Sequence, residues 1–194
     1  MAHASSHETG LTLPAIYYTP HGVAQPLPEF KITTLDENYM QRAVDLAEMA
    51  LRAGDYPVGA VIVDTYGDTY EGYADEFATK RLAGHAEQNA IAQYNKITGK
   101  HTLEGTMIYV TQSPCVGCSY QIDQGHVSIL YEAATRSDCN KATEQEFGKP
   151  IVRPRELDFE NVFNDSSRDI TVVSGLLRAE SIKLFLEKAR EKYT

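Results

Sequence analysis

Two short motifs in the chain combine residue types that bind metal ions and transfer protons. The first is His-Ala-Glu at residues 85–87, and the second is Pro-Cys-Val-Gly-Cys at residues 114–118. A Cys-x-x-Cys pair at the start of a helix places both sulfurs beside the first turn, where the positive end of the helix dipole favours thiolates. Thiolates and imidazole are preferred ligands of zinc. The motifs therefore predict a zinc site formed by His85, Cys115 and Cys118.

The number of ligands indicates what this zinc would do. Three protein ligands with one open position are typical of a catalytic zinc, whereas structural zinc sites are normally closed by four ligands. A water in the open position would have its pKa lowered to about 7, and Glu87 could take its proton and pass it to a substrate. We therefore expect one Zn²⁺ per chain, with Glu87 as the catalytic acid and base rather than as a ligand.

Other interpretations of these residues stay open at this point. The two cysteines could form a redox pair, or half of a structural zinc site that is closed by His101, His126 or Cys139. Taken alone, Glu87 would be an ordinary solvated carboxylate of a helix. Cys139 stands at no ligand spacing from another candidate and is expected to be an ordinary thiol.

The pairing of His-x-Glu with Pro-Cys-x-x-Cys resembles the signature of the cytidine deaminase-like zinc deaminases. The similarity covers about residues 37–194 and is strongest to the branch that contains guanine, cytosine and tRNA adenosine deaminases. It rests on residues 42–44 and 57–63, on the junction at residues 111–115, and on residues 173–177 with the closing helix.

This resemblance implies an activity and a set of substrate contacts. The activity is hydrolytic deamination, in which the exocyclic amine of a small nucleobase or nucleoside is replaced by a carbonyl oxygen and ammonia is released. The implied contacts are Ala86, Ser113 and Asp138, the last from a loop that is similar to guanine deaminases after a shift of one residue. One position departs from the family, because Ala74 stands where many members carry an Asn that binds the base.

The resemblance also implies a homodimer whose partner helps to close the pocket. Two rival functions remain beside the small-molecule deaminase. One is a tRNA adenosine deaminase, and the other is a catalytically silent binding module that zinc stabilises.

Composition narrows the choice of partners. The chain has 194 residues, with 18 Lys and Arg against 27 Asp and Glu and a net charge of −9. This balance disfavours unspecific attraction to phosphate backbones, so a small molecule is the expected partner and nucleic acid the less expected one. Three cysteines do not make a disulfide framework and suit a reducing compartment, for which the cytoplasm is the default. No apolar run predicts a membrane span, and no export signal is recognisable.

The pattern of the chain predicts one domain after a short arm. Residues 1–35 contain Pro14, Pro20, Pro26 and Pro28, which predicts an extended arm without regular structure. Residues 36–194 are predicted to form the zinc deaminase domain. Strands are expected at residues 57–64, 69–73, 106–111, 127–131 and 169–173, and the first two form a hairpin.

Helices are expected between these strands. Thr34 and Glu37 form a capping-box pattern that starts a helix ended by Gly54. Further helices are expected from residue 83, from residue 114 to Gly125, and around residues 182–189. The alternation of strands and helices predicts a three-layer α/β/α sandwich with a mixed five-stranded sheet of the cytidine deaminase-like type.

Residues 134–169 are polar and weakly patterned and predict a long loop that could form a wall of the pocket.

Two segments with basic residues are not expected to bind phosphate or nucleic acid. Lys80 and Arg81 precede the first motif and are expected in a solvated loop rather than at a phosphate. The basic residues of the closing helix alternate with acidic ones, which is typical of a mixed-charge helix face.

Overall fold

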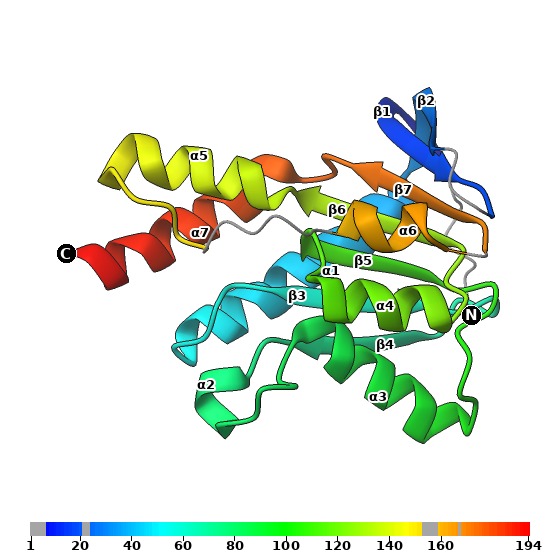
Figure 1. The fold of residues 1–194 in the computed structure, drawn as a ribbon, viewed down its shortest axis with the longest axis horizontal. Helices are drawn as coiled ribbons and strands as arrows, with labels where there is room; N and C mark the ends of the chain where they lie inside the picture. Colours follow the sequence, from blue (N-terminus) through cyan, green and yellow to red (C-terminus); the bar gives the residue numbers. More distant parts are fainter. Residues whose placement is uncertain (1–6, 21–23, 153–158, 167) are drawn as a thin grey trace.

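All five strands expected between residues 57 and 173 are present in a computed structural model of the chain, which describes residues 7–20, 24–152, 159–166 and 168–194. They belong to a seven-stranded mixed sheet whose strand order is β2-β1-β7-β6-β5-β3-β4 (Figure 1). The strands are β1 (Glu8–Tyr18), β2 (Ala24–Thr33), β3 (Gly59–Val63), β4 (Thr69–Tyr73), β5 (Met107–Gln112), β6 (Ile129–Ala134) and β7 (Ile170–Ser174).

Helices cover both faces of this sheet, which confirms the three-layer prediction. The helices are α1 (Thr34–Arg52), α2 (Glu76–Thr79), α3 (Ala86–Thr98), α4 (Val116–Gln124), α5 (Arg136–Phe147), α6 (Phe159–Asn164) and α7 (Arg178–Tyr193). Helices α1 and α7 pack on one face, and α3, α4 and α6 pack on the other. Within the described ranges, none of the helices has the length and apolar character that a membrane span requires.

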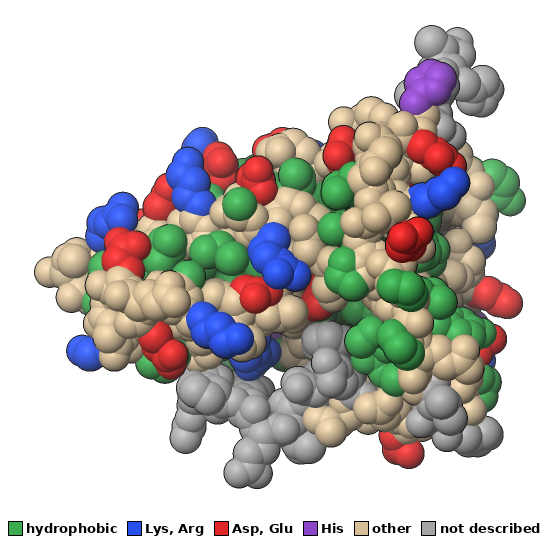
Figure 2. All heavy atoms as spheres, turned by 90° about the horizontal axis from the view of Figure 1, so that it is seen from above, with side chains coloured by type: hydrophobic (Ala, Val, Ile, Leu, Met, Phe, Trp, Pro, Cys, Tyr) green, Lys and Arg blue, Asp and Glu red, His purple; other side chains and the backbone are tan. Residues whose placement is uncertain are grey.

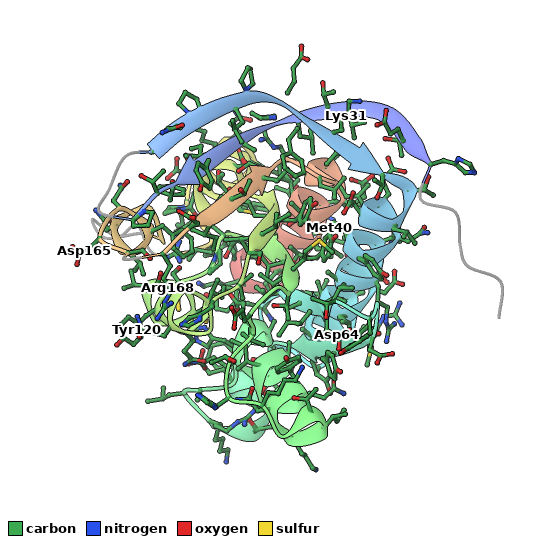
Figure 3. All side chains as sticks on the ribbon, turned by 90° about the vertical axis from the view of Figure 1, so that its right-hand side faces the viewer. Lys31, Met40, Asp64, Tyr120, Asp165 and Arg168 are labelled. Atoms are coloured by element: carbon green, nitrogen blue, oxygen red, sulfur yellow. The ribbon has the colours of Figure 1, made fainter. Side chains whose placement is uncertain are left out.

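The alternation of side chains along the strands explains why both faces carry a core. In β3, Val61 packs with the α1 residue Met40, whereas its neighbour Ile62 packs with Ala86 and Ala90 of α3. Figure 3 shows Met40 inside, between α1 and the sheet. Strands β5, β6 and β7 are parallel to one another, and β3 is antiparallel to both β4 and β5.

The prediction that residues 1–35 lack regular structure is wrong for the described part of this segment. Strands β1 and β2 form an antiparallel hairpin, and β1 pairs with β7 from Ala15 to Tyr18. The sheet therefore has two strands more than expected. The prolines are tolerated because Pro26 and Pro28 lie in the edge strand β2, while Pro14 lies at a shift of register between β1 and β2.

The prediction of a long loop over residues 134–169 is also wrong, because α5 and α6 lie in it. Helix α5 has few apolar residues, and only Cys139 and Thr143 of it are buried. Helix α5 is stabilised by capping interactions at its two ends rather than by a buried apolar face. Thr135 and Asp138 form a capping box at its start, and Gly148 closes its end in the left-handed conformation.

The capping box of α1 lies one residue earlier than predicted. Thr33 is the N-cap, and its hydroxyl accepts a hydrogen bond from the backbone N–H of Asp36, whose carboxylate accepts one from the N–H of Thr33. Asp36 is buried and also accepts a hydrogen bond of 2.6 Å from the Tyr109 hydroxyl. This contact to β5 favours Asp36 over Glu37 as the capping residue.

Helix α3 lies so close to β4 that a glycine is required between them. A Cβ atom at Gly72 would lie 2.2 Å from the carbonyl oxygen of Ala86 and 2.5 Å from the backbone nitrogen of Ala90. Both partners are backbone atoms of α3, so a side chain at this position must move the helix. Gly72 therefore sets the position of the first turn of α3, in which the His-Ala-Glu motif lies.

We expect Gly72→Ala to lower the free energy of unfolding in urea by about 1–3 kcal/mol, because the methyl group overpacks a backbone contact. Gly117→Ala is the control, since the nearest atom to a Cβ there is 3.9 Å away. Equal stability of the two variants would show that α3 is not fixed at Gly72.

Candidate metal centre and active-site cavity

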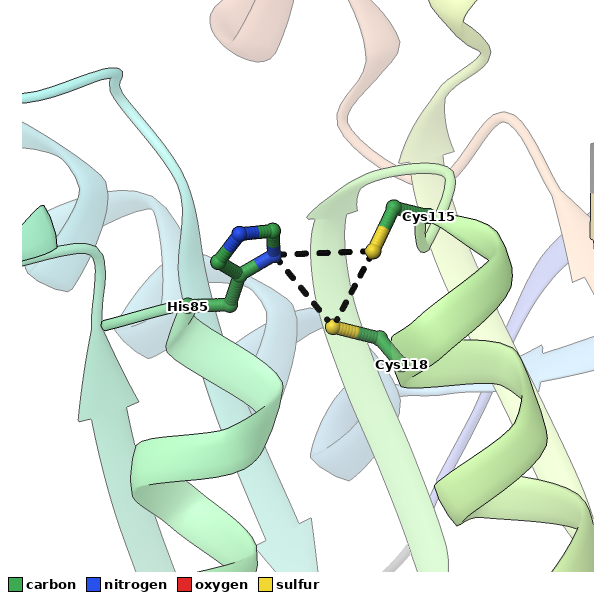
Figure 4. Close-up of side chains that lie close together, drawn as sticks. All are labelled: His85, Cys115 and Cys118. Atoms are coloured by element: carbon green, nitrogen blue, oxygen red, sulfur yellow. Dashed lines mark hydrogen bonds between the residues drawn. The ribbon is translucent and has the colours of Figure 1, made fainter. Parts of the chain in front are cut away.

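The starts of α3 and α4 bring three metal-binding side chains together. His85 is the N-cap of α3, Cys115 is the N-cap of α4, and Cys118 lies in the first turn of α4. The Nδ1 atom of His85 is 3.6 Å from Sγ of Cys115 and 3.4 Å from Sγ of Cys118, and the two sulfurs are 3.6 Å apart (Figure 4). These ligand atoms all lie within 4.8 Å of one another and could hold one metal ion.

The electrostatics of this cluster suit a metal with a preference for thiolates. The hydrogen bond between the two sulfurs lowers the pKa of Cys115 to about 3 and, together with burial, raises the pKa of Cys118. The contact with Cys115 raises the pKa of His85. An imidazole nitrogen beside two sulfurs, at the positive ends of two helix dipoles, is the donor set that zinc takes.

The structure gives no fourth ligand among the described residues. Of the residues that sequence analysis kept open, Cys139 is buried in α5, and neither it nor His101 or His126 belongs to the cluster. The group of His, Cys, Asp and Glu side chains that meets at this point consists of three members. This agrees with an open site rather than with a closed structural one.

Glu87 lies in the first turn of α3, two residues after the candidate ligand His85. Its side chain is nearly inaccessible, with a relative exposure of 3%, and burial raises the pKa of its carboxyl group. Glu87 also lines the same cavity as His85 and Cys115. A buried carboxyl group at this place can exchange protons with a molecule in the cavity.

The cavity beside the cluster has a volume of about 540 Å³, which is enough for a nucleobase or nucleoside. Its walls come from the end of β4, from α2 and α3, from the end of β5 and from the start of α5. The lining residues are Asp55, Tyr56, Val58, Ala74, Glu76, Leu82, Gly84, His85, Ala86, Glu87, Gln88, Gln112, Ser113, Cys115, Gly117, Arg136 and Val152.

Short helix α2 forms one wall of the cavity and is held by a buried carboxylate. Both oxygens of Asp55 accept hydrogen bonds from the start of α2, at 2.8 Å from the N–H of Phe77 and 3.0 Å from the N–H of Ala78. Glu76 of α2 thereby faces His85, with 3.7 Å between its Oε2 atom and Nε2 of the imidazole. A carboxylate on this side favours the imidazole orientation in which Nδ1 faces the sulfurs.

The residues predicted to contact the substrate divide into two groups. Ala86 and Ser113 line the cavity, although the Ser113 hydroxyl already donates a hydrogen bond of 2.5 Å to the buried Glu132. Asp138 is not among the described lining residues, and its carboxylate caps α5 and lies 3.6 Å from Arg178. A substrate contact of Asp138 therefore stays a prediction. Ala74 lines the cavity and offers it no polar side chain.

Several lining residues were not predicted from the sequence. Gln88 directly follows the His-Ala-Glu motif, and Gln112 lies in the junction at residues 111–115, so their positions beside the motifs could have indicated them. Asp55, Glu76 and Arg136 belong to no recognisable motif. They reach the cavity because α1, α2 and α5 meet there in the fold, which the chain alone does not show. Arg136 at the start of α5 shows that the segment after Ala134 does form a wall of the pocket, as expected, although as a helix.

Comparison with known proteins gives a family for this arrangement. Residues 33–134 match the model of the cytidine and deoxycytidylate deaminase zinc-binding region. These residues include β3, α3, β5, α4 and β6, and therefore both motifs.

Individual relatives agree with this match. The chain is 35% identical to a tRNA-specific adenosine deaminase of Bacillus subtilis over 86 residues, which is 44% of this chain and about half, 53%, of the relative. It is 31% identical to a guanine deaminase of Bacillus subtilis over 123 residues, or 62% of this chain and 79% of that enzyme. A solved structure of guanine deaminase from Nitrosomonas europaea has the same fold, with a TM-score of 0.64 and 21% identity over 79% of this chain and 84% of the other.

We expect Asp55→Ala to speed hydrogen exchange of the Phe77 and Ala78 amides by about ten- to a hundredfold. The reason is that two hydrogen bonds to a buried charged group are lost, each worth about 1.5–3 kcal/mol. Asp45→Ala, on the exposed side of α1, is the control. Unchanged exchange at both amides, measured by NMR, would mean that Asp55 does not hold α2.

Proposed function

This chain belongs to the family defined by the cytidine and deoxycytidylate deaminase zinc-binding region, and on this premise we propose that it is a zinc-dependent hydrolytic deaminase of a small nucleobase or nucleoside. The reaction replaces an exocyclic amine by a carbonyl oxygen and releases ammonia. The observation that carries the proposal is the convergence of His85, Cys115 and Cys118 beside a cavity that the buried Glu87 also lines.

In this proposal, His85 Nδ1 and the sulfurs of Cys115 and Cys118 hold the zinc. When bound, zinc supplies a Lewis acid that makes water nucleophilic near neutral pH. Glu87 accepts a proton from the water that attacks the amine-bearing ring carbon and delivers it to the adjacent ring nitrogen. It then transfers the remaining hydroxyl proton to the amine nitrogen, so that the carbon–nitrogen bond breaks, ammonia leaves and the carbon–oxygen double bond forms. Ala86, between His85 and Glu87, lines the cavity and is the residue through which the substrate would contact this turn of α3.

A homodimer is part of the proposal. Phe77 and Leu82 are exposed large apolar residues, with relative exposures of 56% and 86%, and Leu82 lines the cavity. Apolar side chains at the mouth of a site suit contact with another protein surface. A second copy of the chain would cover them and narrow the cavity.

The three free cysteines suit a reducing compartment such as the cytoplasm.

The second candidate function is deamination of adenosine in tRNA. The similarity to the tRNA-specific adenosine deaminase of Bacillus subtilis favours it. The charge of this chain favours the small substrate instead. A tRNA is held largely through its phosphates, which need clustered Lys and Arg. The net charge is −9, and Figure 2 shows Lys and Arg side chains interspersed with Asp and Glu on the face that it presents.

A catalytically silent zinc module, the third alternative, would release no ammonia from any substrate.

We expect one zinc per chain, lost in Cys115→Ser and retained in Cys139→Ser. The first variant removes a sulfur that faces His85, whereas the second removes a buried thiol outside the cluster. Metal analysis of the purified proteins by mass spectrometry measures the ratio. Equal loss of zinc from both variants would contradict the proposed ligands.

We expect the zinc-loaded protein to release ammonia from at least one of cytosine, guanine, adenine and their nucleosides without RNA. Glu87→Gln should lower this rate by about a hundred- to ten-thousandfold, because a general acid and base typically contributes that much. Glu104→Gln, at an exposed position, should keep the parental rate. If the small substrates are inert and the tRNA adenosine becomes inosine, the second candidate replaces the first. A parental rate in Glu87→Gln would exclude Glu87 from the mechanism.

A further inference from the structure

The end of helix α1 forms a tight turn that leads directly into a wall of the active-site cavity. Gly54 adopts the left-handed conformation, with a φ of +87°. Its N–H donates to the carbonyl oxygen of Leu51 at 2.9 Å, and the N–H of Asp55 donates to that of Ala50 at 3.0 Å. These two hydrogen bonds form a Schellman motif, which ends the helix and fixes the direction of the chain after it. The next residues, Asp55 and Tyr56, line the cavity.

A lysine of α7 binds the backbone of this turn. The Lys188 ammonium donates a hydrogen bond of 2.8 Å to the carbonyl oxygen of Gly54. It also lies 3.2 Å from Glu191, and its side chain has a relative exposure of 14%, against 69% for Lys31 on the hairpin. A cation at the C-terminal end of a helix such as α1 also interacts favourably with the helix dipole. Lys188 therefore fixes the peptide group that joins Gly54 to Asp55.

The residues on either side of this contact hold helix α2. Both carboxylate oxygens of Asp55 accept hydrogen bonds from the start of α2, and Asp55 has a relative exposure of 1%. The ring centroid of Tyr56 lies 5.9 Å from that of Phe77, which belongs to α2. Lys192, one turn after Lys188, donates to the Tyr56 hydroxyl at 3.4 Å. Two lysines of α7 thus support the two residues that fix α2.

The position of α2 decides the shape of the cavity near the candidate metal centre. Glu76 of α2 faces the imidazole of His85, and Leu82 from the same segment also lines the cavity. This segment has a second anchor on α3, because the amide of Asn89 donates to the Asp75 carboxylate at 3.0 Å. Loss of the support from α7 would therefore let α2 tilt about the Asp75 anchor while the segment stays folded.

We propose that Lys188 is a positioning residue of the active site, which acts through Asp55 to hold the α2 wall against the substrate. Lys188 is not among the described residues that line the cavity, and it does not belong to the candidate metal cluster. Its role is thus in substrate binding, not in the chemical step or in metal binding. The effect on substrate binding rests on the proposed function, whereas the effect on α2 does not.

Lys188→Met tests this role, because it removes the ammonium and keeps an unbranched apolar side chain. For each base or nucleoside that releases ammonia, we expect KM to rise about two- to thirtyfold, the range for residues that act on a site without touching the ligand. The kcat and the zinc content should stay at the parental values, since a raised KM alone reports lost binding. Hydrogen exchange at the Phe77 and Ala78 amides should become faster relative to Leu130, which is buried in β6.

Lys183→Met is the matched control, since Lys183 lies exposed on the same helix and its loss changes the net charge equally. It should keep the parental KM and exchange rates. Lys188→Arg should also keep them, because a guanidinium can donate to the same carbonyl oxygen. A purely structural role of Lys188 would lower the thermal unfolding midpoint and speed exchange at Phe77 and Leu130 alike, with KM unchanged. This result would overturn the inference.

The remaining outcomes separate the inference from the proposed function. Parental KM and exchange rates in Lys188→Met overturn the inference alone, because ammonia release continues. If Lys188→Arg behaves like Lys188→Met, the donated hydrogen bond is not the cause, and the inference fails as well. If no base or nucleoside releases ammonia, the proposed function fails. Exchange at the Phe77 and Ala78 amides then decides by itself whether Lys188 holds α2.

Discussion

The close contact between the backbone of α3 and β4 at Gly72 is the constraint on which the candidate site depends. It fixes where α3 starts, because the carbonyl oxygen of Ala86 has no room to move toward the sheet. The residue before this helix is His85 and the second residue in it is Glu87. The position of the candidate metal-binding nitrogen and that of the carboxyl group proposed to transfer protons are thus set by one contact of the main chain.

The second half of the site is placed by the sheet itself. Strand β5 lies in the middle of the sheet and is paired on both sides, so its end is rigid. Three residues beyond its end, Cys115 caps α4, and the parallel strand β6 ends beside Gln112 at Ala134. Loops that follow the carboxyl ends of neighbouring parallel strands meet at one edge of the sheet, where ligand sites of α/β folds commonly lie. The cavity between α3, α4 and α5 is such a site.

The chemistry of the site could be predicted from the sequence because its residues are close together in short motifs. His85 with Glu87, and Cys115 with Cys118, each lie within one helical turn, and local spacing is what a sequence displays directly. The five strands between residues 57 and 173 were predictable for a similar reason, since they are short, most of them are apolar, and Gly or Pro residues lie near their ends. By contrast, Asp55 reaches the site only because α1 ends beside α2, which is a long-range contact.

The hairpin and helix α5 were missed for two different physical reasons. Pro26 and Pro28 indicate irregular structure when the neighbouring strand is unknown, but on an edge strand a missing N–H costs little. Nothing in residues 8–33 shows that β2 will be an edge. Helix α5 has almost no apolar stripe, so periodicity could not reveal it, although its capping residues Thr135 and Asp138 were visible. Capping residues are a weaker signal of a helix than a periodic apolar face, because they indicate where a helix starts but not how long it is.

The distribution of charge explains why selectivity would depend on hydrogen bonds inside the cavity. Many basic side chains of the described chain are already paired with acidic ones, so a phosphate would have to displace a carboxylate before it could bind. These pairs are Arg42 with Glu71, Arg52 with Glu48, Arg81 with Asp75, Arg178 with Asp138 and Arg190 with Glu146. A neutral heterocycle needs no such exchange, and the net charge of −9 neither attracts nor repels it. Its binding is then decided inside the cavity, where hydrogen bonds are electrostatically stronger than in water.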